Sequence, residues 1–316
     1  MKIIKIALFT ICALSAYAPE ALGGVLLDLV KTNKIEEVQE YIEEQGNGEV
    51  NQANKYEETP LYWACYRNNL EIVKLLLKNG AKESVNKAGE YEETPLYWAC
   101  YRNNLEIVKL LLKNGAKESV NKAGVYGDTP LYLACYNNNP EIVKLLLDNG
   151  AKESVNKAST KHEKTPLYWA CYNNNLEIVK LLLENGVKDS VNKADNDGYT
   201  PLYLACWNNN PEIVKLLLDY GAKESVNKAN TYGKTPLYWA CSNNNLEMVK
   251  LLLKNGAKES VNKAGNDGET SLYWVCVKNY LEMVKLLLEN GADATTGVSG
   301  KKAIERICSS EWTIEN

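Results

Sequence analysis

Residues 59–88 read TPLYWACYRNNLEIVKLLLKNGAKESVNKA, and close copies of this stretch fill most of the chain. Successive copies begin 35 or 36 residues apart, each at a threonine: Thr59, Thr94, Thr129, Thr165, Thr200, Thr235 and Thr270. A fixed period of this size is typical of a repeat architecture, in which each unit packs against its neighbours. The sequence therefore predicts a repeat solenoid.

Each copy predicts two short helices followed by a long loop. Thr59 can accept hydrogen bonds as an N-cap, and Pro60 suits the first helical position. Asn68 ends the first helix, because asparagine tolerates the left-handed conformation, and Asn69 is placed to cap the second. The apolar residues of 70–77 form one wide face. A helix pair this short cannot bury that face alone, so the copies must stack into an all-α repeat solenoid.

The TPL opening, the helix core LEIVKLLL and the NGA ending recur along the chain, which resembles an ankyrin-repeat protein over about residues 24–309. The resemblance implies helix-turn-helix units with long finger loops, in about eight repeats with a C-terminal capping helix. Three features depart from the family pattern. Tyr62 and its equivalents replace a histidine, Asn-Asn replaces Gly-His between the helices, and the period exceeds the family's value of about 33. We place the two extra residues in the KESVN segment of the loop.

The chain divides into four expected parts: a signal peptide at 1–23, an N-terminal capping repeat at 24–58, seven repeats of about 35 residues at 59–292, and a C-terminal capping helix and tail at 293–316. The first part combines two early lysines, an apolar stretch and small residues, which is the pattern of a secretory signal. Cleavage after Ala18 or Gly23 fits the small residues there. We therefore expect export to the periplasm or the medium, with no membrane attachment after cleavage.

The composition argues against several function classes. The 316 residues include 36 Lys and Arg against 40 Asp and Glu, and no basic block suggests nucleic-acid binding. The single histidine, His162, excludes a His-cluster metal site. No glycine-rich phosphate loop occurs. The Lys, Glu and Ser of the KESVN segment recur in five of the seven copies, and we interpret them as a solvated loop. We expect no catalytic, cofactor or metal residues, and no enzyme.

Seven of the nine cysteines occupy one repeat position, where ankyrin repeats usually have a buried alanine: Cys65, Cys100, Cys135, Cys171, Cys206, Cys241 and Cys276. Equivalent atoms in neighbouring repeats should lie about 8–10 Å apart, whereas a disulfide needs Cα atoms within about 7 Å. We therefore expect buried thiols. Cys308, in the predicted cap, is the remaining candidate for a disulfide with a partner.

The resemblance implies a partner-binding concave face, made by the finger loops and the exposed ends of the first helices. The predicted binding residues at the helix ends are Tyr66, Arg67, Tyr101, Arg102, Tyr136, Tyr172 and Trp207; those in the fingers are Tyr56, Tyr91, Tyr126 and Tyr232. Tyrosine and tryptophan dominate interface hot spots. Alternatively, these rings cover the next repeat or descend from one ancestral copy. Trp63 and its equivalents exchange with Leu133 and Leu204, which predicts core packing instead.

Three functions remain open. The first is an exported monomeric scaffold that binds a protein partner, without cofactor or nucleic acid; similar proteins occur in host-associated bacteria. The second is a cell-envelope structural or protective protein acting in its own compartment. The third is a rod that binds carbohydrate or another small ligand, since tyrosine and tryptophan also suit sugar rings. A deep pocket would favour the third, and a shallow groove the first two.

Overall fold

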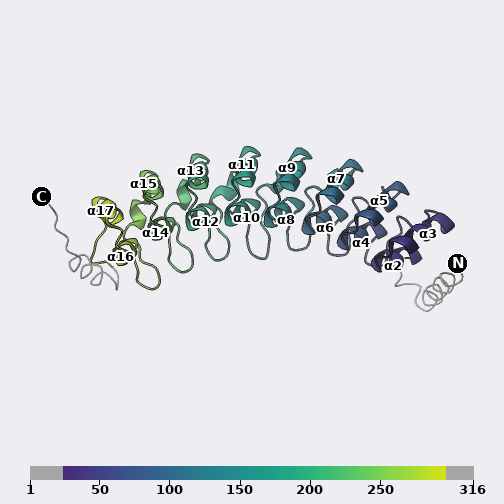
Figure 1. The fold of residues 1–316 in the computed structure, drawn as a ribbon, viewed down its shortest axis with the longest axis horizontal. Coiled ribbons are helices and arrows are strands. Elements are labelled where there is room, and N and C mark those ends of the chain that lie inside the picture. The colour runs from purple at the N-terminus through teal and green to yellow at the C-terminus, as the bar shows by residue number, and fades with distance from the viewer. Residues whose placement is uncertain (1–23, 297–316) are drawn as a thin grey trace. The chain divides into compact units, whose positions relative to one another are not determined.

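The computed structural model describes residues 24–296. The predicted signal peptide, Cys308 and most of the predicted C-terminal capping segment lie outside the described residues. Within them, all regular secondary structure is helical, and the α-helices come in short consecutive pairs (Figure 1). This arrangement confirms the all-α repeat solenoid. The described chain forms two compact units, which divide between Lys161 and His162.

The first unit contains four helix pairs. Their bounds are α2 (Val25–Lys31) and α3 (Ile35–Gln45), α4 (Pro60–Tyr66) and α5 (Leu70–Lys78), α6 (Pro95–Tyr101) and α7 (Leu105–Lys113), and α8 (Pro130–Tyr136) and α9 (Pro140–Asp148). Short 3-10 helices follow at Ala116–Ser119 and Ala151–Ser154. Within this unit, each first helix packs against the first helix of the next pair: α2 against α4, α4 against α6, and α6 against α8.

The second unit also contains four pairs. Their bounds are α10 (Pro166–Tyr172) and α11 (Leu176–Glu184), α12 (Pro201–Trp207) and α13 (Pro211–Asp219), α14 (Pro236–Ser242) and α15 (Leu246–Lys254), and α16 (Ser271–Val277) and α17 (Leu281–Glu289). Its 3-10 helices are Asp189–Asn192, Ala222–Ser225 and Ala257–Ser260.

The predicted capping residues act as expected. Thr59 Oγ1 accepts a hydrogen bond from the backbone N–H of Tyr62 at 3.2 Å, and Pro60 is the first residue of α4. Asn68 has a φ of 59°, in the left-handed region. Asn69 Oδ1 accepts from the N–H of Ile72 at 3.0 Å and so caps α5. The sharp reversal between the helices therefore follows from local side-chain chemistry.

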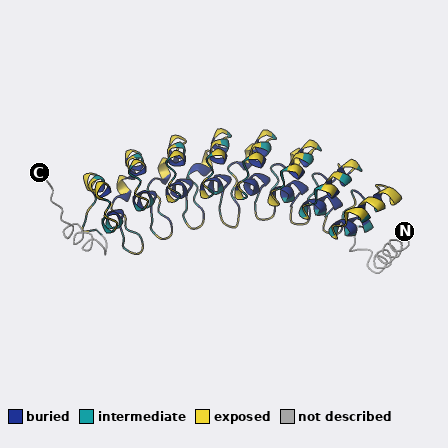
Figure 2. Cartoon of the chain, in the orientation of Figure 1, coloured by how far each residue is buried: buried dark blue, intermediate teal, exposed yellow. Residues whose placement is uncertain are grey.

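The core lies between the first helices and the inner sides of the second helices. Leu61, Ala64 and Cys65 of α4 are fully buried, as are Ile72 and Leu76 of α5. Figure 2 shows this distribution, with buried residues concentrated in the first helices and exposed ones along the outer sides of the second. None of the seven repeat cysteines forms a disulfide, and only the last, Cys276, is partly exposed.

The Asn-Asn pairs also join neighbouring repeats. The Nδ2 of Asn69 donates to Asn33 Oδ1 at 2.7 Å, and that of Asn104 donates to Asn68 Oδ1 at 2.8 Å. The same bond recurs from Asn139, Asn210 and Asn245 to the preceding repeat. The substitution of Asn-Asn for Gly-His thus supplies a turn, a cap and an inter-repeat contact together.

The KESVN segment corrects one expectation from the sequence. Its lysine and glutamate are exposed, but Ser84 and Val85 are buried. Ser84 Oγ donates to Asn51 Oδ1 at 2.6 Å, and Asn51 Nδ2 donates to the Gly80 carbonyl at 2.9 Å. The segment is therefore not simply a solvated loop, because its serine ties each repeat to the asparagine of the preceding one.

Candidate partner-binding surface

The finger tyrosines, Tyr56, Tyr91, Tyr126 and Tyr232, are all exposed, from 43% for Tyr56 to 62% for Tyr232. The backbone carbonyl of each accepts an N–H from the next finger; Thr160 N, for example, lies 2.8 Å from Tyr126 O. The finger backbones are therefore tied together while the rings remain accessible. The structure places these four tyrosines in the fingers, and their role in partner binding stays a prediction.

The helix-end aromatics, Tyr66, Tyr101, Tyr136, Tyr172 and Trp207, are the last residues of α4, α6, α8, α10 and α12. The last four are exposed by 43–50%. Tyr66 is half-buried, whereas its neighbour Cys65 is fully buried. Tyr66 is the least accessible of the five helix-end aromatics. Its ring contacts Trp98 edge-on, with the centroids 4.7 Å apart.

The two predicted arginines lie against these rings. The Cζ of Arg102 is 5.0 Å from the Tyr66 centroid and 5.6 Å from that of Tyr101. Its Nε donates to the Tyr66 carbonyl at 2.8 Å. Arg67 lies 5.7 Å from the Trp63 ring and 5.9 Å from the Tyr66 ring. The chain's own cations therefore already cover part of the aromatic surface around Tyr66.

The tryptophans of the first helices are more accessible than predicted. Trp63, Trp98, Trp169, Trp239 and Trp274 are all partly exposed, whereas Leu133 and Leu204 at the same repeat position are buried. The indole N–H of Trp63 donates to Glu58 Oε2 at 3.0 Å. These tryptophans therefore lie at the edge of the core rather than wholly within it, because the larger side chain extends from the core to the surface. A leucine stops short of it.

Each leucine at this position lies beside a pocket. In the first unit, a pocket of about 330 Å³ is lined by Tyr101, Asp128, Tyr132, Leu133, Tyr136 and Asn137. In the second unit, another pocket of about 330 Å³ is lined by Tyr168, Tyr172, Tyr199, Tyr203, Leu204, Trp207 and Trp239. We call the second one the aromatic box.

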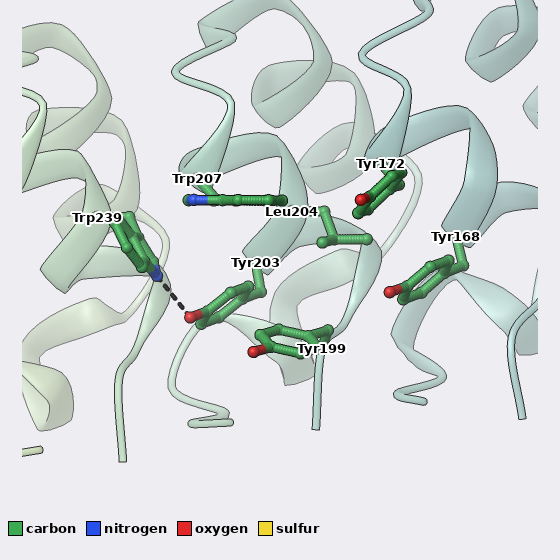
Figure 3. A pocket seen from close by; sticks show the side chains of 7 residues that line it. All are labelled: Tyr168, Tyr172, Tyr199, Tyr203, Leu204, Trp207 and Trp239. Atoms are coloured by element: carbon green, nitrogen blue, oxygen red, sulfur yellow. Dashed lines mark hydrogen bonds between the residues drawn. The ribbon is translucent and has the colours of Figure 1, made fainter. Parts of the chain in front are cut away.

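Figure 3 shows the aromatic box, with Tyr172 and Trp207 along one edge, Tyr168, Tyr199 and Tyr203 along the opposite edge, and Leu204 between them. The Tyr172 and Trp207 centroids are 6.0 Å apart. The Tyr203 hydroxyl accepts hydrogen bonds from Trp239 Nε1 at 2.6 Å and from Asn230 Nδ2 at 3.0 Å. Burial raises the pKa of Tyr203 to about 12, despite the opposing effect of the bond from Trp239. Its phenol is therefore neutral at physiological pH.

A buried carboxylate lies next to the aromatic box. Asp195 Oδ1 accepts from the backbone N–H groups of Asp197 and Tyr199, at 3.0 and 2.9 Å, and its Oδ2 is buried beside Tyr168. Burial, followed by the charge of Asp195, raises the pKa of Tyr168. The carboxylate therefore lies behind the lining of the box, beside Tyr168.

Sequence reasoning identified only two residues of the aromatic box, Tyr172 and Trp207. It missed Tyr168, Tyr199, Tyr203, Leu204 and Trp239, which come from three successive repeats. One signal was present: Leu204 stands where most copies have tryptophan, three residues before the exposed Trp207. A loss of side-chain volume beside an exposed ring is a reasonable mark of a pocket.

The described part of the chain holds no cluster of three metal-binding side chains. Nor does any helix within residues 24–296 have the length and apolarity needed to cross a bilayer. His162 is an exposed finger residue.

Comparison with known families agrees with this architecture. A family model described as ankyrin repeats (three copies) matches five overlapping segments: residues 26–122, 83–158, 118–190, 152–228 and 222–297. No curated protein matches the chain. Since the matched segments together cover residues 26–297, the chain belongs to the ankyrin-repeat family.

Proposed function

We propose that this protein is an exported, monomeric scaffold that binds a protein partner through its finger tyrosines and helix-end aromatics, without catalysis. Ankyrin repeats generally mediate protein–protein interaction. The observation that carries the finer proposal is the exposure of these rings, which reaches 50% for Tyr136 and 62% for Tyr232. Tyrosine and tryptophan offer large amphipathic contact area at low entropic cost, so they are enriched where proteins bind.

Affinity capture with residues 24–316 tests the proposal, using envelope extract of the source organism and lysate of a plausible host. A variant with Tyr66, Tyr101, Tyr136 and Tyr172 changed to serine runs in parallel. We expect a partner that the unchanged protein captures and the variant loses. The matched control changes four exposed lysines of the second helices to serine: Lys74, Lys109, Lys144 and Lys180. This control should still capture the partner.

Equal capture by all three proteins would contradict binding through the helix-end aromatics. Loss of capture by the lysine variant alone would move the binding surface to the second helices. Circular dichroism on each variant establishes that the fold is retained. A loss of capture is evidence about the binding surface only for a variant that retains the fold.

Export is tested by the mass of the mature protein and by where it is found. We expect a polypeptide that begins at residue 19 or 24. Its presence in spent medium supports a secreted scaffold, whereas its confinement to the envelope fraction supports the second function, a protective or structural protein in its own compartment. An intact N-terminus beginning at Met1 would contradict export.

The aromatic box favours one other candidate, a site for a small neutral ligand such as a sugar. Stacked aromatic rings around about 330 Å³ suit a sugar ring in size. Titration with neutral mono- and disaccharides, followed by the tryptophan signals, tests this candidate. Saturable binding that Trp207→Ser removes would support it.

A further inference from the structure

Aromatic rings of the first helices are repeatedly covered by the chain's own cations. Lys31 Nζ lies 4.9 Å from the Trp63 ring, Arg102 Cζ lies 5.0 Å from Tyr66, and Lys234 Nζ lies 4.0 Å from Tyr238. A cation over a ring face is attracted by the ring's negative quadrupole. These contacts show that the ring faces of this surface accept cationic groups.

The aromatic box breaks this pattern. The repeat position of Arg102 holds Asn208 and Asn243 in the repeats that form the box. Their side chains keep the backbone contact that Arg102 makes, since Asn208 Nδ2 donates to the Tyr172 carbonyl at 3.1 Å and Asn243 Nδ2 to the Trp207 carbonyl at 3.4 Å. An asparagine is too short to extend over the ring as the arginine does.

Three of the rings that line the aromatic box are consequently left without a cation. Within residues 24–296, no lysine or arginine lies over Tyr172, Trp207 or Trp239. Tyr168, which also lines the box, does have a cation over its ring, since Lys164 Nζ lies 4.9 Å from the centroid. Tyr172 and Trp207 each remain 43% exposed.

We propose that the aromatic box binds the guanidinium of an arginine side chain supplied by a protein partner, in the place that Arg102 takes over Tyr66 in the first unit. The inference rests on the proposed function and specifies its partner: a segment with an accessible arginine. A guanidinium is planar, stacks on aromatic faces and sheds water more readily than an ammonium. The buried carboxylate of Asp195, next to Tyr168, adds negative charge near this site.

The lining fits a cation better than a sugar. Sugar hydroxyls need several hydrogen-bonding partners, and the box offers only the edges of its rings for this, the hydroxyls of four tyrosines and the N–H groups of two tryptophans. The Tyr203 hydroxyl already accepts from both Trp239 and Asn230. The face of a ring can attract a cation without any free hydrogen-bonding group.

Indole N–H signals in the NMR spectrum of residues 24–316 provide the test, because Trp207 and Trp239 line the box. The probe is acetyl-Gly-Arg-Gly-amide, and its neutral counterpart carries citrulline, which has nearly the same shape. We expect the arginine peptide to shift the Trp207 and Trp239 signals saturably. The citrulline peptide should bind about tenfold or more weakly, because it has lost the cation–π attraction.

Asn243→Arg is the decisive variant, because it should place the protein's own guanidinium over Trp207, as Arg102 lies over Tyr66. We expect it to weaken binding of the arginine peptide at least about tenfold. Asn137→Arg is the matched control, since it makes the same change in the first unit and should leave binding unaltered. Arginine occurs naturally at this repeat position in Arg67 and Arg102, so both variants are compatible with the fold. Should Asn243→Arg misfold, Trp207→Ser replaces it, because Ser242 is the natural residue at that position one repeat later.

The inference would be overturned by the absence of a saturable shift with the arginine peptide, by equal binding of the citrulline peptide, or by unchanged binding by Asn243→Arg. Stronger binding of a neutral disaccharide than of the arginine peptide would make the box a sugar site and would also overturn it. Failure here is distinguishable from failure of the proposed function. Suppose that Asn243→Arg captures a partner as well as the unchanged protein does and that the four-tyrosine variant loses it. That result supports the scaffold function and rejects only the binding of an arginine in the aromatic box.

Discussion

The side chain of the second asparagine in each Asn-Asn pair stabilises both the second helix of its repeat and the junction with the preceding repeat. Asn104 Oδ1 accepts from the N–H of Ile107 at 3.1 Å, and its Nδ2 donates to Asn68 of the preceding repeat. Loss of an N-cap costs about 0.5–2 kcal/mol, and a lost hydrogen bond about 0.5–1.5 kcal/mol. The single position therefore contributes both to a helix and to the junction between repeats.

We expect Asn104→Ala to lower the free energy of unfolding by about 1–3 kcal/mol, because it removes both bonds. Asn104→Ser should cost less, since serine also caps helices but is too short to reach Asn68. Urea unfolding of the two variants beside the unchanged protein measures the difference. Equal losses for serine and alanine would mean that the bond between repeats contributes nothing.

Cys276 differs from the other repeat cysteines in accessibility. Burial raises its pKa to about 11, whereas Cys65 and its equivalents in the other repeats are completely buried. Because the thiolate is the nucleophile, we expect iodoacetamide to label Cys276 before the other six repeat cysteines in the folded protein, at a rate that rises about tenfold per pH unit below pH 11. Peptide mass mapping measures each site. Labelling of Cys135 before Cys276 would contradict the structure.

At the scale of the element, the last helix pair lacks the asparagine cap that the second helices α5, α7, α9, α11, α13 and α15 all have. Tyr280 occupies the N-cap position of α17, where the equivalent residue elsewhere in the described repeats is asparagine or, in α3, lysine, and it makes no side-chain cap bond. Asn279 before it already has the left-handed φ of 59°. The backbone is therefore ready for an asparagine at the next position.

We expect Tyr280→Asn to raise the free energy of unfolding by about 1 kcal/mol, by supplying the missing cap. Hydrogen exchange of the α17 amides should slow accordingly. Tyr280→Ala is the control for removal of the tyrosine alone. If Asn and Ala gave the same exchange rates, the missing cap would not be what limits this helix.

The 3-10 helix after α7 forms a second junction between repeats. Ser119 Oγ donates to Asn86 Oδ1 at 2.6 Å, and Ser119 is buried. We expect Ser119→Ala to lower the free energy of unfolding by about 1–2 kcal/mol, and exposed Lys117→Ala to change it by about 0.5 kcal/mol or less. Urea unfolding compares them. Similar losses for the two variants would contradict a structural role for the serine.

At the scale of the whole molecule, the repeats share a sensitivity to high pH. Burial raises the pKa of Cys65, Cys100 and their buried equivalents above the ordinary value of 9.0, and also raises the pKa of Tyr62 above 10.0. Above pH 9 the unfolded chain loses these protons more readily than the folded chain. The folded state then binds more protons, so its stability is constant at lower pH and falls as the pH rises.

We expect the urea midpoint to be steady up to about pH 8 and to fall progressively between about pH 9 and 11. Replacing Cys65, Cys100 and Cys135 by alanine, the usual residue of the family, should make the early part of this decline shallower. The tyrosines account for the later part. A midpoint that is independent of pH over this range would contradict the raised pKa values.

The sequence alone determined the repeat, the two helices of each copy and their caps. These features depend on residues within a few positions of one another. Thr59 accepts a hydrogen bond from the backbone N–H three residues later, and Asn68 reverses the chain through its own left-handed φ. Periodicity then made stacking necessary, because helices of this length cannot bury an apolar face alone. The family could accordingly be recognised before any coordinates were known.

Only the tertiary structure decided which side chains are covered. The covering residue lies one repeat away, as with Arg102 over Tyr66 and Ser84 against Asn51. The aromatic box exists because Leu204 is smaller than the tryptophan at its repeat position, while rings from neighbouring repeats surround the space. Burial and cavities depend on the sum of side-chain volumes from several repeats in contact, and the spacing of residues within one repeat does not contain that sum.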